Sequence, residues 1–107
     1  MSLALRLRQR ARRDLERISD QYDAEQEGLG HEFLAEVGET LHHLEEWPEL
    51  TPVIGRMPDN LPIRKRNLKR FEYQIIYVLD GQSLHVLAVF HARSDPARLQ
   101  DRTTDER

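Results

Sequence analysis

Residues 71–93 read FEYQIIYVLDGQSLHVLAVFHAR and contain the clearest secondary-structure signal in the chain. Every second residue from Phe71 to Tyr77 is aromatic or aliphatic, which is the period-two pattern of a β-strand. Residues 84–93 are almost continuously apolar, as is typical of an interior strand that is covered on both faces. Asp80 and Gly81 stand between the two runs and favour a tight type I′ turn. The stretch therefore predicts a β-hairpin inside a sheet.

Two further strands are predicted outside this hairpin. Residues 63–68 precede it and form an extended segment rich in lysine and arginine. At the start of the chain, three leucines alternate with other residues over residues 3–8, which indicates a short half-buried strand. Residues 48–62 contain four prolines and Gly55, and this composition predicts a surface loop that leads into the basic strand.

Two amphipathic helices are predicted between the first strand and this loop. Apolar residues recur at spacings of three and four in both segments and so lie on one stripe of each helix. The first stripe consists of Ala11, Leu15, Ile18 and Tyr22, and the second of Phe33, Val37, Leu41 and Leu44. Gly28 and Gly30 can end the first helix, and Pro48 ends the second after Trp47. The short connection predicts an antiparallel helical hairpin.

The order of these elements predicts an α+β fold, β-α-α-β-β-β, in which the helical hairpin packs on a small antiparallel sheet. The chain of 107 residues is long enough for one hydrophobic core. We expect a single domain over residues 1–99, followed by a polar tail over residues 100–107.

Charge is strongly segregated along the chain, although the net charge is only −3. Residues 1–17 hold six arginines against two acids, and residues 18–60 hold eleven acids against one arginine. Residues 61–73 hold five cations against one acid. This pattern favours contact with charged partners. The acids of the second helix are interpreted as a solvated face; they include Glu32, Glu36 and Glu39.

Composition excludes several classes of function. The chain has no cysteine, which removes disulfides, thiolate nucleophiles and cysteine-ligated zinc and fits a reducing compartment. It has no apolar run of membrane-spanning length and no secretion signal, so we expect a cytoplasmic protein. No glycine-rich phosphate loop, nucleophile elbow or zinc-binding His-Glu-x-x-His pattern occurs. We therefore expect no cofactor.

The basic strand is the first candidate binding site. Arginine binds phosphate and carboxylate through paired hydrogen bonds, and the neighbouring Tyr73 offers a ring for stacking. A nucleic acid or an acidic peptide would fit such a group. A second interpretation is an edge strand whose charges only discourage aggregation. The cations of the segment are Arg64, Lys65, Arg66, Lys69 and Arg70.

The histidines do not predict a metal site. His42 and His43 are adjacent on a helix and diverge, while His85 and His91 are predicted to share one strand face about 20 Å apart. His91 and Arg93 are also predicted to share a face, and we expect them to meet Arg64, Arg66 or Arg70 across the sheet. A histidine beside arginines can transfer a proton to or from a phosphate ester, although a strand histidine is more often a packed side chain.

Five segments in this order resemble the ParE/RelE superfamily of bacterial toxins, whose members are also described as plasmid stabilisation proteins. They are Ala11-x-x-Asp14-Leu15-x-x-Ile18, Leu29-Gly30-x-x-Phe33-x-x-Glu36-Val37, Leu44-x-x-Trp47-Pro48, Arg64-x-x-x-Leu68-x-Arg70-Phe71-x-Tyr73-x-Ile75-x-Tyr77 and Val86-Leu87-Ala88-Val89-x-His91-x-Arg93-x-Asp95-Pro96. The resemblance spans residues 3–99. It implies the β-α-α-β-β-β fold, growth arrest by the free toxin, and a cognate antitoxin with a disordered tail that folds over the toxin.

The resemblance leaves two activities open. ParE-like members poison DNA gyrase without known catalysis, whereas RelE-like members cut messenger RNA on the ribosome with a basic cluster and a C-terminal tyrosine. Here no tyrosine follows Tyr77, and residues 91–96 are close to the His-x-Arg-Arg-Asp-Pro ending of ParE-like members, with Ser94 in place of the second arginine. We therefore expect a ParE-like gyrase inhibitor.

Candidate residues follow from each interpretation. The residues expected to bind antitoxin or target are Arg64, Arg66, Arg70, Tyr73, His91 and Arg93. If the chain is instead a ribosome-dependent endoribonuclease, the candidates for phosphate binding and proton transfer are Arg64, Arg70, Tyr73, His91 and Arg93. A third interpretation is a family member that binds its antitoxin without being toxic.

Overall fold

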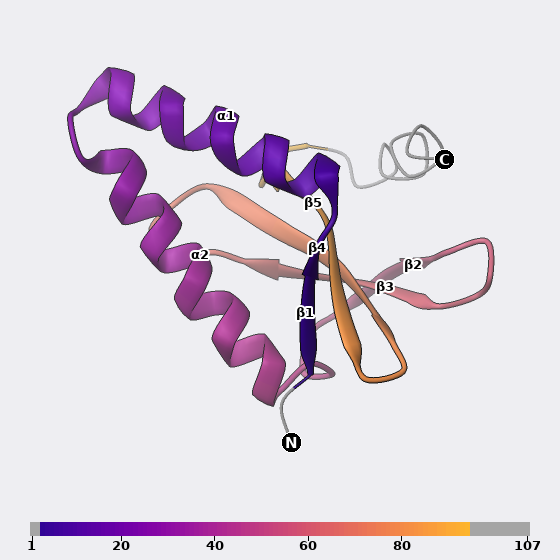
Figure 1. Cartoon of the computed structure of the whole chain (residues 1–107). Helices are drawn as coiled ribbons and strands as arrows, with labels where there is room; N and C mark the ends of the chain where they lie inside the picture. Colours follow the sequence, from indigo (N-terminus) through magenta and orange to yellow (C-terminus); the bar gives the residue numbers. More distant parts are fainter. Residues whose placement is uncertain (1–2, 95–107) are drawn as a thin grey trace.

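Two helices pack against one face of a five-stranded sheet in the computed structural model, which describes residues 3–94 (Figure 1). In chain order the elements are β1 (Ala4–Leu7), α1 (Gln9–Glu25), α2 (Leu29–Glu46), β2 (Val53–Arg56), β3 (Pro62–Asn67), β4 (Tyr73–Asp80) and β5 (Ser83–His91). The predicted end of the domain at residue 99 and the predicted tail 100–107 lie outside the described residues. Within residues 3–94, no helix is long and apolar enough to cross a bilayer.

The predicted fold class and the predicted central hairpin are confirmed. The strand order is β1-β5-β4-β3-β2, with β4 and β5 antiparallel neighbours joined by a turn in which Gly81 has a φ of 62°. One detail differs, because β1 pairs with β5 in parallel and makes the sheet mixed rather than purely antiparallel. The alternation of residues in β1 reveals which side chains are buried, but it carries no information on the direction of the neighbouring strand.

The predicted loop 48–62 contains a strand, and that part of the expectation is wrong. Val53–Arg56 form β2, which pairs antiparallel with β3 and has a register shift at Gly55. With only four residues and prolines on both sides, β2 has no periodic pattern of its own. Its presence overturns the interpretation of the basic strand as an edge strand, because β3 is paired on both sides, with β2 and with β4.

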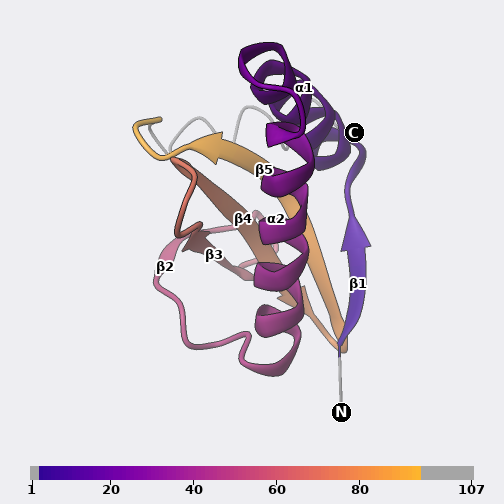
Figure 2. The same ribbon diagram turned by 90° about the vertical axis from the view of Figure 1, so that its left-hand side faces the viewer.

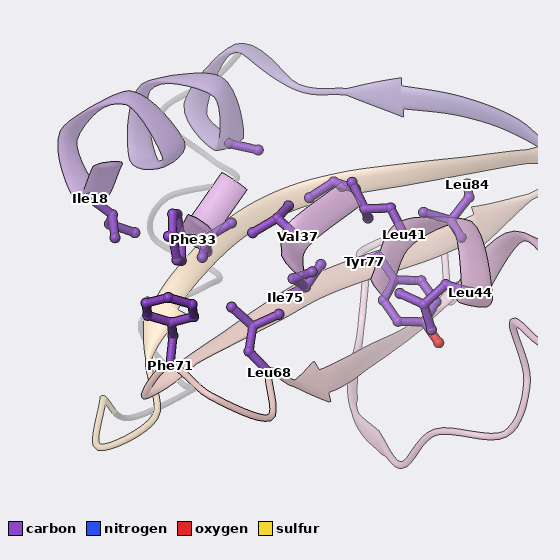
Figure 3. Packing of buried hydrophobic residues seen from close by; sticks show 13 residues of the cluster. Ile18, Phe33, Val37, Leu41, Leu44, Leu68, Phe71, Ile75, Tyr77 and Leu84 are labelled. Atoms are coloured by element: carbon purple, nitrogen blue, oxygen red, sulfur yellow. The ribbon is translucent and has the colours of Figure 1, made fainter. Parts of the chain in front are cut away.

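The main core lies between the sheet and the helical hairpin (Figures 2 and 3). Both predicted stripes face it, and their most buried members include Ile18 of α1 and Phe33 of α2. On the sheet, alternate residues of β4 such as Ile75 and Tyr77 point into the same core. The opposite face of the sheet carries a smaller apolar cluster built from Ile63, Ile76, Val78, Leu87, Ala88 and Phe90.

A β-bulge in β5 changes which side chains share a face. Ile76 pairs with Ala88 but Tyr77 pairs with Val86, so Leu87 is an extra residue without a partner on β4. The bulge reverses the alternation beyond it. His85 therefore lies across from Val78 on the outer face, while His91 lies across from Tyr73 on the helix-facing side. The expectation that the two histidines share one face is wrong for this reason.

One polar contact joins α1 to the sheet, and a second joins α1 to α2. The Asp14 side chain is 1% exposed, and its Oδ2 accepts a hydrogen bond of 2.9 Å from the backbone N–H of Val89 near the bulge. The backbone N–H of Gly30 donates a 2.8 Å bond to Asp23 Oδ1 where α2 crosses α1. A Cβ on Gly30 would lie 2.3 Å from the carbonyl oxygen of Ser19, so this crossing requires glycine.

Candidate functional site

Strand β3 divides its cations between the two faces of the sheet. Arg64 and Arg66 lie opposite Tyr77 and Ile75 of β4, both of which face the helices. Lys65 lies opposite Ile76, which faces the outer cluster. Alternation along an extended strand explains the split, and it leaves only two arginines of β3 on the helix-facing side.

Arg64 is held by the chain's own backbone. Its Nη1 donates hydrogen bonds to the carbonyl oxygens of Thr51, at 2.8 Å, and Glu49, at 3.2 Å. The buried Tyr77 hydroxyl fixes the same segment, because it donates to the Pro48 carbonyl at 2.7 Å and bonds the Thr51 hydroxyl at 2.5 Å. Arg64 therefore positions the segment between α2 and β2 through its Nη1 atom.

Arg66 borders a basic pocket at the β2–β3 side of the sheet. This basic pocket, of about 240 Å³, is lined by Leu50, Thr51, Pro52, Lys65, Arg66 and Asn67. Large apolar side chains are exposed in the adjoining segment, with Trp47 at 53%, Leu50 at 72% and Val53 at 47%. Cations beside exposed apolar side chains are a typical composition for a protein-binding surface. Sequence reasoning missed these three residues, although apolar residues within a proline-rich segment were a visible signal.

Arg70 lies in the turn between β3 and β4 and pairs with α2. Its Nη2 is 2.9 Å from Glu32 Oε1, and this hydrogen bond is the main cause that raises the pKa of Arg70. The guanidinium carbon is 5.3 Å from the centre of the Phe71 ring. Glu36 accepts hydrogen bonds from the backbone N–H groups of Lys69, at 2.6 Å, and Arg70, at 3.2 Å. The interpretation of Glu32 and Glu36 as a merely solvated face is therefore wrong.

Tyr73 and His91 meet at the other end of β4. Their rings are 5.2 Å apart in an edge-to-face arrangement. His91 Nδ1 accepts a hydrogen bond of 3.2 Å from the backbone N–H of Arg93, and His91 Nε2 lies 3.4 Å from Glu72 Oε2. Both ring nitrogens are thus engaged by this chain's own groups, and Arg93 contributes its backbone to the arrangement.

The space beside this pair is an acidic pocket. It has a volume of about 260 Å³ and is lined by Ile18, Gln21, Tyr22, Glu25, Glu72, Tyr73 and His91. The pKa of Tyr22 is raised, chiefly by burial and further by Tyr73, Glu25 and Glu72. The lining therefore favours a neutral or positively charged group and disfavours phosphate.

The structure brings Tyr73, His91 and the backbone of Arg93 together, but it does not join them to the cations of β3. The acidic and basic pockets share no lining residue. Arg66 is on β3 and His91 on β5, so that β4 separates them. Arg64 lies opposite Tyr77, four residues along β4 from Tyr73 and therefore roughly 13 Å away. The expected meeting of His91 and Arg93 with Arg64, Arg66 or Arg70 is not observed among the contacts of residues 3–94.

Solved structures of bacterial toxins share this fold. The chain is similar to a chain of the chromosomal ParDE toxin–antitoxin system from Pseudomonas aeruginosa, with 16% identity, a TM-score of 0.70, and 84% of this chain and 96% of that chain covered. For E. coli toxin RelE, an arginine-to-alanine double mutant in the free state, the identity is 17% and the TM-score 0.64, with 98% of this chain and 97% of that chain covered. For a chain of the toxin–antitoxin complex RelBE2 from Mycobacterium tuberculosis, the identity is 22% and the TM-score 0.59, with 85% of this chain and 99% of that chain covered. The fold is therefore that of the ParE and RelE toxins.

The sequence itself identifies the family. Residues 5–96 match the family model of the ParE toxin of the type II toxin–antitoxin system parDE. The chain thus belongs to the ParE toxin family, and the resemblance stated from its motifs is confirmed. No curated protein sequence matches the chain.

Proposed function

We propose that this toxin arrests bacterial growth by binding DNA gyrase in the cytoplasm, and that a cognate antitoxin neutralises it. The proposal treats the chain as a binding protein and not as a nuclease. It assigns contact with antitoxin or target to the basic pocket around Arg66, with Trp47, Leu50 and Val53 as the apolar anchors.

The observation that carries the proposal is the separation of the cations from the proton-transfer candidates. Cleavage of RNA by transesterification needs cations around the pentavalent phosphate, with a base and an acid at the same place. Here Tyr73 and His91 border a pocket lined by Glu25 and Glu72, and a carboxylate near the reacting phosphate would oppose the developing negative charge. Arg70 is paired with Glu32 and is thus partly neutralised.

The basic pocket supports the binding role by its composition. Arg66 is half-buried beside Leu50, and no ion pair uses it among the residues that the structure describes. An arginine next to exposed apolar side chains is a typical centre of a protein–protein interface. A disordered acidic antitoxin tail that folds on binding fits the same surface, since it can pair with Lys65 and Arg66 and cover Leu50.

One observation favours ribosome-dependent RNA cleavage as the second candidate. The contact between Tyr73 and His91, 5.2 Å between ring centres, brings together two side chains of the kinds that act as acid and base in catalysis. In that case the ribosome, through its proteins or bound cations, would have to supply the missing positive charge around the scissile phosphate.

Two parallel assays separate the candidates. Purified full-length toxin is added to DNA gyrase with relaxed plasmid, and in a second reaction to translating ribosomes with a defined message. We expect loss of supercoiling or accumulation of cleaved plasmid, and intact message. Codon-specific cleavage of the message with unaffected gyrase would establish the nuclease instead. If induced expression does not slow growth and neither assay responds, the chain is a non-toxic antitoxin-binding member.

A further inference from the structure

The junction between β1 and α1 carries an arginine surface that the proposed function does not use. Four arginines within eight positions are exposed there: Arg6 and Arg8 at the end of the edge strand, and Arg12 and Arg13 on the first turns of the helix. We name these four residues the arginine surface. The backbone N–H of Arg12 bonds the Arg8 carbonyl at 3.0 Å, so the end of the strand adjoins the first turn of the helix.

These arginines have no ionic partner among residues 3–94. Other arginines of the chain do pair, as Arg17 with Asp14 at 3.2 Å and Arg70 with Glu32 at 2.9 Å. Positive charge from the arginine surface also reaches β5, because Arg8 and Arg6 add to the effect of burial in lowering the pKa of His85. The positive charge of this region is therefore left for a partner.

Helix stability does not explain the arrangement. Helices favour acids in the first turn and a serine, threonine, aspartate or asparagine at the N-cap. Here α1 has no acid in its first turn, and its N-cap is Arg8, whose side chain makes no capping bond. A cation in the first turn of a helix is unfavourable, because the helix dipole is positive at that end. Arg8 and Arg12 lie at this end of the helix although they do not stabilise it, which points to a role in binding an anion.

The surroundings indicate what kind of anion fits. The large exposed apolar residues of the described chain are Leu34, Trp47, Leu50 and Val53, and none of them belongs to β1 or α1. A protein partner usually needs such anchors. Single-stranded nucleic acid is usually held by exposed aromatic rings, and residues 4–14 contain no aromatic residue. A duplex backbone needs only guanidinium groups and helix N–H groups.

We propose that the arginine surface binds the phosphate backbone of duplex DNA without sequence specificity. The acids of the chain are concentrated in residues 18–60, which follow the first half of α1, so α1 runs from a basic end to an acidic end (Figure 1). This polarity orients the molecule, with the β1–α1 junction toward the DNA and the α1–α2 connection away from it.

The test measures binding of full-length toxin to a fluorescein-labelled 20-base-pair duplex by fluorescence anisotropy over a salt series. For four phosphate contacts we expect a slope of log K against log salt of about −3 to −4. Arg12→Gln with Arg13→Gln should weaken binding about tenfold at low salt and reduce the slope by about 2. Arg6→Gln with Arg8→Gln should weaken binding and reduce the slope by similar amounts.

The matched control is Arg56→Gln with Lys69→Gln, which removes the same net charge from exposed residues outside the arginine surface. It should change the affinity less than about twofold. An equal loss in the control, or no binding by the wild type at low salt, overturns the proposal. If a polyglutamate of equal charge binds as tightly as the duplex and competes with it, the surface accepts acidic protein segments and the assignment to DNA is wrong.

Discussion

The surroundings of Tyr73 and Tyr77 on strand β4 have opposite electrostatic character, although both side chains face the helices. At the Tyr73 end, Glu25 and Glu72 add to the effect of burial and raise the pKa of Tyr22. At the Tyr77 end, burial raises the pKa of the tyrosine, while the bond to Thr51 and the charges of Arg64 and Arg66 act in the opposite direction. Two tyrosines four residues apart on one strand thus lie in surroundings of opposite charge.

This difference teaches how the superfamily resemblance should be interpreted here. A nuclease would gather its cations and its proton-transfer groups around one phosphate, whereas this chain places Arg66 in one pocket and His91 in another. A basic pocket bordered by apolar side chains suits the binding of a macromolecule. The substitutions described next test whether the acidic pocket beside Tyr73 and the basic surroundings of Tyr77 act independently.

The largest expected effect is on the hairpin crossing beside the acidic pocket. Gly30→Ala should lower the free energy of unfolding by about 1–3 kcal/mol, because its Cβ would collide with the Ser19 carbonyl. Urea denaturation measures the change. Gly38→Ala is the matched control on the same helix; its Cβ meets nothing within 4 Å, and we expect unchanged or slightly higher stability. Equal stabilities of the two variants would mean that the helices do not cross this closely.

A smaller loss of stability is expected from a substitution at Tyr77. Tyr77→Phe removes the hydroxyl that bonds Pro48 and Thr51, and it should cost about 1–2 kcal/mol in urea denaturation. Tyr73→Phe is the control beside the acidic pocket, because within residues 3–94 no hydrogen bond to the Tyr73 hydroxyl is observed, and it should cost clearly less. If both substitutions cost the same, the Tyr77 hydroxyl does not hold the segment beside the basic pocket.

Arg70 tests whether the turn between β3 and β4 takes part in binding. Arg70→Ala should leave folding almost unchanged, because the side chain is exposed and its ion pair with Glu32 is at the surface. It should weaken antitoxin affinity or toxicity several-fold. Affinity is measured by titration calorimetry and toxicity by growth after induction, with Arg56→Ala as the exposed control. Unchanged affinity together with unchanged toxicity would remove Arg70 from the interface.

The smallest expected effect is electrostatic. Glu72→Gln should move the pKa of Tyr22 downward, toward the ordinary value of 10.0, since one of the charges that raise it is removed. Nuclear magnetic resonance of labelled tyrosine follows the titration, and Glu45→Gln on the distant part of α2 is the control. Because the folded state holds the Tyr22 proton more tightly, this group stabilises the fold below pH 10 and ceases to do so at higher pH. An unchanged Tyr22 pKa in the Glu72→Gln variant would contradict the acidic character of the pocket.

Much of the fold was predictable from local patterns. Asp80-Gly81 between apolar runs gave the hairpin, and the two apolar stripes gave the helices, because burial repeats every two or about 3.6 residues. The short edge strand β2 has no period to detect, and its discovery depends on pairing with β3. The bulge at Leu87 also leaves no local pattern, yet it decides that His85 and His91 face opposite sides.

The candidate site was predictable only in part. The sequence indicated the cations of β3 and the pairing of helix with sheet, but not which cations the chain itself would engage. Arg64 is fixed by the carbonyl oxygens of Glu49 and Thr51, which are distant in sequence. Asp14 was visible as a polar residue on the stripe between Ala11 and Ile18, and its hydrogen bond to Val89 explains its position there.

The most direct test of the central claim compares growth arrest by two variants, Arg66→Glu and His91→Ala, induced to equal levels and shown by circular dichroism to be folded. Binding through the basic pocket predicts that His91→Ala still arrests growth and inhibits gyrase, while Arg66→Glu loses both by about tenfold or more. If Arg66→Glu keeps full activity and His91→Ala no longer arrests growth, the account is contradicted and the function lies in the acidic pocket.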